Sequence, residues 1–86
     1  MKFRISEHAQ SELNRRGIPL SALEAVLQNP QQMVPTNDNR VIYQSMMDSN
    51  DGKQFLLRAI VDPKYEPSLV VTAYRTTKLK KYWRTS

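Results

Sequence analysis

The spacing of apolar residues changes at Pro30, and the two parts of the chain predict different secondary structure. Between Leu23 and Leu27, apolar residues recur at the intervals of a helix with one apolar face. After Pro30, residues 40–48 and 53–61 suit strands and flank Asp51-Gly52, a strong signal for a β-hairpin. The sequence therefore predicts helices first and an antiparallel sheet second.

Two helices are predicted in the first third of the chain, each with start and stop signals. Ser6 can cap the first helix, and Gly17 can end it in the left-handed conformation. Ser21-x-x-Glu24 is a capping box that opens the second helix. Asn29-Pro30 ends that helix, because the residue before a proline disfavours helical backbone.

Strand signals bracket the helices and the hairpin. Residues 2–5 suit a short first strand, and residues 69–76, rich in β-branched side chains, suit the last one. The order is then β-α-α-β-β-β, with one more short strand at 32–34 as the alternative. A chain of 86 residues makes one domain with a thin core, which we expect to span residues 1–86. The prediction is an α+β fold with two helices packed on an antiparallel sheet.

The register of the hairpin decides which side chains share a face. With Asp51-Gly52 as a two-residue loop, Met46 lies opposite Leu57 and Ser45 opposite Arg58. The face expected under the helices then holds Ile42, Met46, Phe55, Leu57, Ala59 and Val61, interrupted by Gln44. Arg58 points to the other face, where its guanidinium either reaches solvent along its stem or meets an anion.

Alternation within residues 69–76 sends one set of side chains to the core and the other to the face of Arg58. The expected core set is Leu69, Val71 and Ala73, and the set beside Arg58 is Thr72, Tyr74 and Thr76. The last strand is therefore predicted to display hydroxyl groups next to a guanidinium, on a rigid element.

The whole net charge of +5 lies in the C-terminal tail, residues 75–86. The eight acids all precede the tail, eight cations that also precede it balance them, and the tail holds the other five cations. A local positive field indicates a phosphate backbone, an anionic membrane surface or an acidic protein as partner, and a solvated, frayed chain end is the alternative. The chain contains no cysteine, and no apolar run has the length of a signal peptide or membrane span. We therefore expect a soluble, cytoplasmic protein that does not bind membranes.

Five short motifs together resemble the bacterial family catalogued as domain of unknown function 4258. They are Ser6-Glu7-His8-Ala9, Arg15-Arg16-Gly17-Ile18, Leu27-Gln28-Asn29-Pro30, Tyr43, and Val70-Val71-Thr72-Ala73-Tyr74-Arg75-Thr76. That family looks related to RelE/ParE-like toxins and, more distantly, to the barnase-colicin-RelE ribonucleases. The resemblance implies two N-terminal helices on a curved antiparallel sheet, a toxin-like ribonuclease of a bacterial toxin-antitoxin system, and a neutralising antitoxin or immunity protein.

Carried onto this chain, the resemblance implies an active site at His8, Arg58, Tyr74 and Thr76. Metal-independent RNA cleavage needs a base for the 2′-hydroxyl, a cation for the phosphorane and an acid for the leaving oxygen. His8 is the only side chain here that ordinarily exchanges a proton near neutral pH. The alternative places it in a charged solvent-facing stripe with Glu12 and Arg15.

The tail supplies residues that suit RNA. Guanidinium and ammonium groups match phosphate oxygens, and aromatic rings stack on unpaired bases. The expected RNA-binding residues are Arg75, Lys78, Lys80, Lys81, Tyr82 and Trp83. One histidine and no cysteine predict no metal site, and two glycines leave no phosphate-cradling loop, so no cofactor is expected.

Three function classes remain open from the sequence. The first is the endoribonuclease acting on messenger or transfer RNA. The second is a non-catalytic module that binds RNA or inhibits gyrase, with the basic tail supplying affinity. The third is a protein-interaction domain whose tail docks an acidic antitoxin. All three predict salt-sensitive binding.

Overall fold

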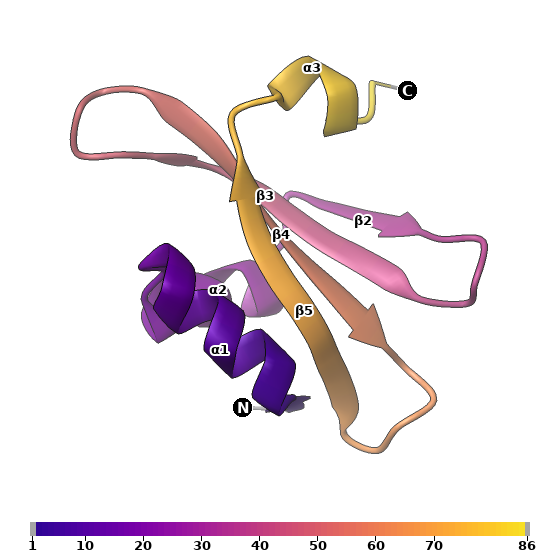
Figure 1. Ribbon diagram of the computed structural model, residues 1–86. Helices are drawn as coiled ribbons and strands as arrows, with labels where there is room; N and C mark the ends of the chain where they lie inside the picture. The colour runs from indigo at the N-terminus through magenta and orange to yellow at the C-terminus, as the bar shows by residue number, and fades with distance from the viewer. Residues whose placement is uncertain (1, 86) are drawn as a thin grey trace.

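The computed structural model describes residues 2–85, and its elements run β-α-α-β-β-β-β-α (Figure 1). They are β1 (Phe3–Ile5), α1 (Glu7–Arg16), α2 (Leu20–Gln28), β2 (Gln32–Pro35), β3 (Val41–Asp48), β4 (Gln54–Asp62), β5 (Ser68–Thr76) and α3 (Leu79–Tyr82). The α+β class and the two N-terminal helices are confirmed. The short strand that the sequence left as an alternative is β2.

The five strands form one sheet in the order β1-β5-β4-β3-β2. Strands β2 to β5 form an antiparallel meander, but β1 pairs with β5 in parallel, so the sheet is mixed and the prediction of a purely antiparallel sheet is wrong. The reason is topological. The chain passes from β1 through both helices to the far edge, and the meander then returns β5 to β1 running in the same direction.

Helices α1 and α2 cover one face of this sheet and form the core with it, while α3 lies apart from them over the other face (Figure 1). The buried core residues are Ala9, Leu13, Ile18, Leu23, Val26, Leu27, Leu57, Ala59, Val61, Val70 and Ala73. No helix among the described residues is long and apolar enough to cross a membrane.

The caps of α1 follow the sequence, but the start of α2 does not. Ser6 Oγ accepts a hydrogen bond from the Ala9 amide at 3.0 Å, and Gly17 adopts a left-handed conformation with φ of 65°. The second helix begins at Leu20, with Pro19 as its extended N-cap residue, so the capping box at Ser21 is wrong. Proline fixes a φ that suits the entry to a helix, which lets α2 start two residues earlier.

The hairpin between β3 and β4 has a longer loop than a two-residue turn, and this shifts its register by one. Ser49 donates to the Lys53 carbonyl at 2.8 Å, and Gly52, with φ of 81°, donates to the Ser49 carbonyl at 3.1 Å. A type I turn followed by a left-handed glycine has this geometry. Ser45 therefore pairs with Leu57 and Gln44 with Arg58.

A one-residue shift turns every side chain of β3 to the opposite face. Tyr43 and Met47 pack toward the helices, and Ile42 and Met46 do not belong to that core. The predicted core positions of Ile42 and Met46 are therefore wrong, whereas those of Leu57, Ala59 and Val61 in β4 are confirmed.

A bulge in β5 corrects the predicted core set of the last strand. Ile60 pairs with Thr72 and Val61 pairs with Val70, so Val71 is an extra residue between them. Val70 therefore reaches the core in place of Leu69 and Val71, and the predicted core position of Ala73 is confirmed. Beyond the bulge the expected alternation holds, and Tyr74 pairs with Arg58.

Candidate functional site

Arg58 lies at the centre of the sheet, on the face opposite α1 and α2. It belongs to the middle strand, between Gln44 of β3 and Tyr74 of β5. Its Nε donates to Gln44 Oε1 at 2.9 Å, and an Nη donates to the Tyr74 hydroxyl at 2.5 Å. The residue is only 7% exposed, so neutral neighbours hold a nearly buried cation.

Gln44 connects this guanidinium to the end of the chain. Its side chain is completely buried, and its Nε2 donates to Gln32 Oε1 at 2.8 Å and to the Tyr82 carbonyl at 3.1 Å. Gln32 in turn donates to the Arg84 carbonyl at 2.5 Å and accepts from the Arg84 amide at 3.0 Å. A continuous polar network therefore runs from the sheet centre to the C-terminal segment.

Tyr82 of α3 covers Arg58 from above. Its ring centroid lies 4.2 Å from Arg58 Cζ, within the range of a cation–π contact. The same ring meets Tyr74 edge-on, with centroids 6.4 Å apart and an interplanar angle of 74°. We call residues 79–84 the tail lid, because they close the face on which Arg58 lies.

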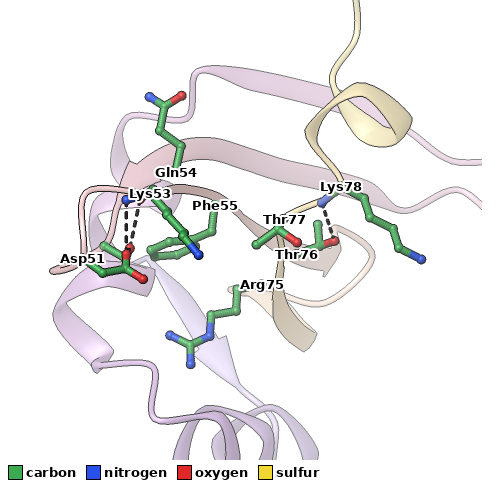
Figure 2. Close-up of a pocket in the computed structure, with 9 residues that line it drawn as sticks. Asp51, Lys53, Gln54, Phe55, Arg75, Thr76, Thr77 and Lys78 are labelled. Carbon is green, nitrogen blue, oxygen red and sulfur yellow. Dashed lines mark hydrogen bonds between the residues drawn. The ribbon is translucent and has the colours of Figure 1, made fainter.

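A second cluster of cations surrounds an open pocket at the tip of the β3–β4 hairpin and the end of β5 (Figure 2). This basic pocket has a volume of about 520 Å³ and is lined by Ser49, Asp51, Lys53, Gln54, Phe55, Arg75, Thr76, Thr77 and Lys78. Three of the lining residues are cations. The Arg75 guanidinium lies 5.8 Å from the Phe55 ring centroid, and the Thr76 hydroxyl oxygen accepts from the Lys78 amide at 3.1 Å.

Asp51 is the one carboxylate of the basic pocket, and the hairpin loop binds it. The Ser49 hydroxyl and, at 3.2 Å, the Lys53 amide both donate to it. The bond from Ser49, and then that from Lys53, holds the pKa of this carboxyl below its usual range. Both bonds are made to the same oxygen, Oδ1, and Lys53 projects its ammonium group into the pocket (Figure 2).

The structure separates the four residues of the predicted catalytic set. Arg58 and Tyr74 are brought together, as expected, and Thr76 lies at the end of β5 in the basic pocket. His8 is exposed on α1, which packs through Ala9 on the opposite face of the sheet. The sheet therefore lies between the imidazole and the guanidinium, and His8 does not join this site.

The charged stripe proposed for α1 exists without a contact to His8. Glu12 accepts from Arg15 Nε at 2.9 Å and from Arg16 Nε at 3.2 Å. The hydrogen bond from Arg15 is the main cause that lowers the pKa of Glu12 to about 2. Glu12 therefore stays ionised with its two arginines over the working range of pH.

Some of the residues predicted to bind RNA are exposed, and the others are half-buried. Arg75, Lys78, Lys80 and Lys81 are exposed. Tyr82 instead turns inward over Arg58, and Trp83 lines a shallow pocket with Met46, Leu79, Lys80 and Thr85. Of the two aromatic rings that were expected to meet bases, Tyr82 therefore packs on Arg58 of the sheet and Trp83 is half-buried.

Sequence reasoning missed Gln32, Gln44 and Lys53. Gln44 carried a signal, because it interrupted an otherwise apolar face, but the wrong register paired Arg58 with Ser45 instead. Gln32 and Lys53 carried none, since their roles depend on contacts across the sheet and on the pocket. Among residues 2–85, no three side chains of the metal-ligating kinds come together as a metal-binding group.

The comparisons with known proteins give a family and no function. Searches of the curated proteins and of the solved structures returned no match. The family described as "Domain of unknown function (DUF4258)" matches residues 5–75, which include most of the sheet, Arg58 and Tyr74. On this match, which spans well over half of the chain, the protein belongs to the DUF4258 family.

Proposed function

We propose that this protein is an RNA-binding domain of the RelE/ParE-like, toxin-associated kind, and that the basic pocket holds the RNA backbone. The observation that carries this proposal is the gathering of Lys53, Arg75 and Lys78 around one open pocket. Lys53 lies in the β3–β4 hairpin loop, Arg75 in β5 and Lys78 just after β5, so the fold and not the tail alone creates the positive surface.

The other lining groups of the basic pocket suit a ribonucleotide strand. Thr76 and Thr77 bring hydroxyl groups that can bond phosphate oxygens, and Phe55 brings an aromatic ring. Asp51 would repel a phosphate, but it is one acid against the three cations of the lining, so the pocket stays positive. The exposed Lys80 and Lys81 extend the positive surface beyond the pocket along the chain end. A backbone-tracking surface of this kind favours single-stranded RNA.

The biological setting belongs to the same proposal. Two helices on one face of a sheet and a basic opposite side support a RelE/ParE-like assignment, although β1 departs from an antiparallel arrangement. A toxin of this kind acts in the bacterial cytoplasm and is neutralised by an antitoxin or immunity protein. The growth of cells that produce the protein alone, with their RNA inspected afterwards, tests the toxic effect.

RNA binding is tested by salt dependence in a matched pair of triple variants. Each phosphate contact with single-stranded nucleic acid contributes about 0.7 to the slope of log affinity against log salt. Replacing Lys53, Arg75 and Lys78 by Gln should therefore lower that slope by about 2. Between 50 and 200 mM salt, the parent would lose roughly 18-fold more affinity than the variant.

The matched control replaces three exposed cations outside the basic pocket: Lys2→Gln, Arg4→Gln and Lys64→Gln. It removes the same net charge, so it shows how much the overall positive charge of the protein contributes to the slope. Fluorescence anisotropy with a labelled oligoribonucleotide measures both variants. Equal losses of slope in the two triple variants would show that the pocket contacts no phosphate.

The second candidate function is metal-independent RNA cleavage, and the 2.5 Å bond between Arg58 and the Tyr74 hydroxyl favours it. In such a reaction the 2′-oxygen loses its proton to a base and attacks phosphorus, while the 5′-oxygen leaves and gains a proton. Arg58 would stabilise the phosphorane, and the Tyr74 phenol would relay the proton from the 2′-oxygen to the leaving 5′-oxygen in place of His8.

Cleavage has a sharp test because it depends on the 2′-hydroxyl. Arg58→Gln and Tyr74→Phe should remove cutting of an RNA substrate, whereas His8→Ala should leave it intact. A substrate with a single 2′-deoxynucleotide at the cut site is the control and should resist. Absence of cutting by the parent protein leaves the binding proposal as the function.

A further inference from the structure

Arg58 is a nearly buried cation that no carboxylate neutralises. The ion pairs within residues 2–85 involve Arg15, Arg16 and Arg40, and none involves Arg58. Its partners are an amide oxygen, a phenol and an aromatic face. A buried charge is costly unless an opposite charge compensates it. An anion bound next to Arg58 would therefore lower the free energy of this site.

The element that covers Arg58 adds to the positive charge. The tail lid carries Lys80, Lys81 and Arg84. The Tyr82 ring lies near two cations, with Arg58 Cζ at 4.2 Å and Lys81 Nζ at 5.2 Å from its centroid. Two like charges near one ring repel each other, and an anion at Arg58 would offset this repulsion.

The tail lid is fastened by few contacts. Helix α3 has four residues, none of them buried, and so short a helix has little stability of its own. The polar bonds that hold it come from Gln44 to the Tyr82 carbonyl and from Gln32 to the Arg84 backbone. Segments with few buried contacts open locally far more readily than the whole fold unfolds.

We propose that Arg58 is the centre of a second anion site, which Tyr82 closes in the free protein and which a phosphate group opens by displacing the tail lid. This proposal rests on the proposed function in one respect, that RNA supplies the phosphate. The phosphate oxygens bind the Arg58 guanidinium, the Tyr74 hydroxyl and Gln44 Nε2, which loses one of its two acceptors when the Tyr82 carbonyl departs. Planar guanidinium groups match two phosphate oxygens at once.

The test follows the Nε–Hε signal of Arg58 in the NMR spectrum of the full ¹⁵N-labelled chain during titration with inorganic phosphate. Sodium chloride is exchanged for phosphate at constant ionic strength. Tyr82→Ala should lower the dissociation constant for phosphate at least tenfold relative to the parent, because the lid no longer competes. Arg58→Gln in the Tyr82→Ala background should abolish the binding.

Tyr65→Ala is the matched control. Tyr65 is also a tyrosine between two cations, with Arg4 at 5.7 Å and Lys64 at 5.5 Å, but it lies away from Arg58. Its removal should leave phosphate binding unchanged. If Tyr82→Ala fails to fold, Gln32→Ala releases the tail without touching the guanidinium and should produce the same gain in affinity.

The outcomes test three things separately: the tail lid, RNA as the source of the phosphate, and the basic pocket. A phosphate response that persists without Arg58, or that is equal in parent and Tyr82→Ala, overturns the proposal. An oligoribonucleotide that fails to move the Arg58 signal overturns RNA as the source and leaves free phosphate. The triple variant at Lys53, Arg75 and Lys78 keeps the response of Arg58 to inorganic phosphate, so failure of the proposed function is recognised separately.

Discussion

Replacing Gln44 by Leu tests whether the polar network holds Arg58 and the tail lid. Gln44 is completely buried and takes part in three hydrogen bonds, one from Arg58 and two from its own Nε2. Leucine has a similar size but offers neither a donor nor an acceptor. The substitution therefore removes the acceptor of Arg58 Nε and one donor each from Gln32 Oε1 and the Tyr82 carbonyl.

The expected loss of stability follows from those three bonds. A hydrogen bond to a charged group contributes about 1.5–3 kcal/mol and a neutral one about 1 kcal/mol. The new apolar side chain offsets roughly 1.5 kcal/mol through its burial. The net destabilisation should therefore be about 2–3 kcal/mol. This is a large fraction of the stability of so small a domain.

Urea unfolding followed by far-ultraviolet circular dichroism measures this change, because Trp83 lies in the tail lid and its fluorescence would report lid release. Ser45→Ala, which removes one neutral hydrogen bond at the neighbouring buried position, is the control. Because small proteins have a urea slope near 1 kcal/mol per molar, the midpoint should fall by about 2–3 M. Limited proteolysis should also cut the tail lid faster in Gln44→Leu. A loss below about 1 kcal/mol would refute the reasoning, since Arg58 would then be held by something other than Gln44.

Three further outcomes follow from the structure. Gly17→Ala should lose about 1 kcal/mol in urea unfolding, because φ of 65° is strained for a side chain, and Gly17→Asn should lose less. Glu12→Gln should lower the melting temperature at pH 7, and the gap to the parent should close as the pH falls from about 4.5 to about 2, where the parent's Glu12 gains its proton and the stabilisation goes. If the gap persists at pH 2, the arginine pairs are not its cause. His8→Ala should leave RNA affinity unchanged in anisotropy titrations, and a loss would place His8 in the interface.

The meeting of Arg58 with Tyr74 could be predicted, because two strands of known alternation that share one sheet face must present neighbouring side chains. The partner of Arg58 on β3 could not be predicted. Loop length fixes register, and the type of turn at residues 49–53 changes Ser45 into Gln44 opposite Arg58. A single loop residue thus decided whether a hydroxyl or an amide supports the guanidinium.

The assignment of His8 to the site failed for a related reason. The apolar pattern placed the helices on the face of Leu57 and Arg58 on the other face, but it does not tell whether a side chain of the first helix reaches around the edge of the sheet. The core residues Ala9 and Leu13 place α1 opposite Arg58. Whether two catalytic side chains lie close together depends on the tertiary structure, and the order of motifs along the chain does not predict it.

The sequence by itself determined the elements, since helix period, caps, β-branched runs and turn residues act over a few neighbouring positions. It also determined that the positive charge lies at the chain end. Only the tertiary structure decided that Tyr82 folds back over Arg58, and that Lys53 joins Arg75 and Lys78 in one pocket. These contacts join residues distant in the chain, and their free energy depends on desolvation and packing that arise when the layers assemble.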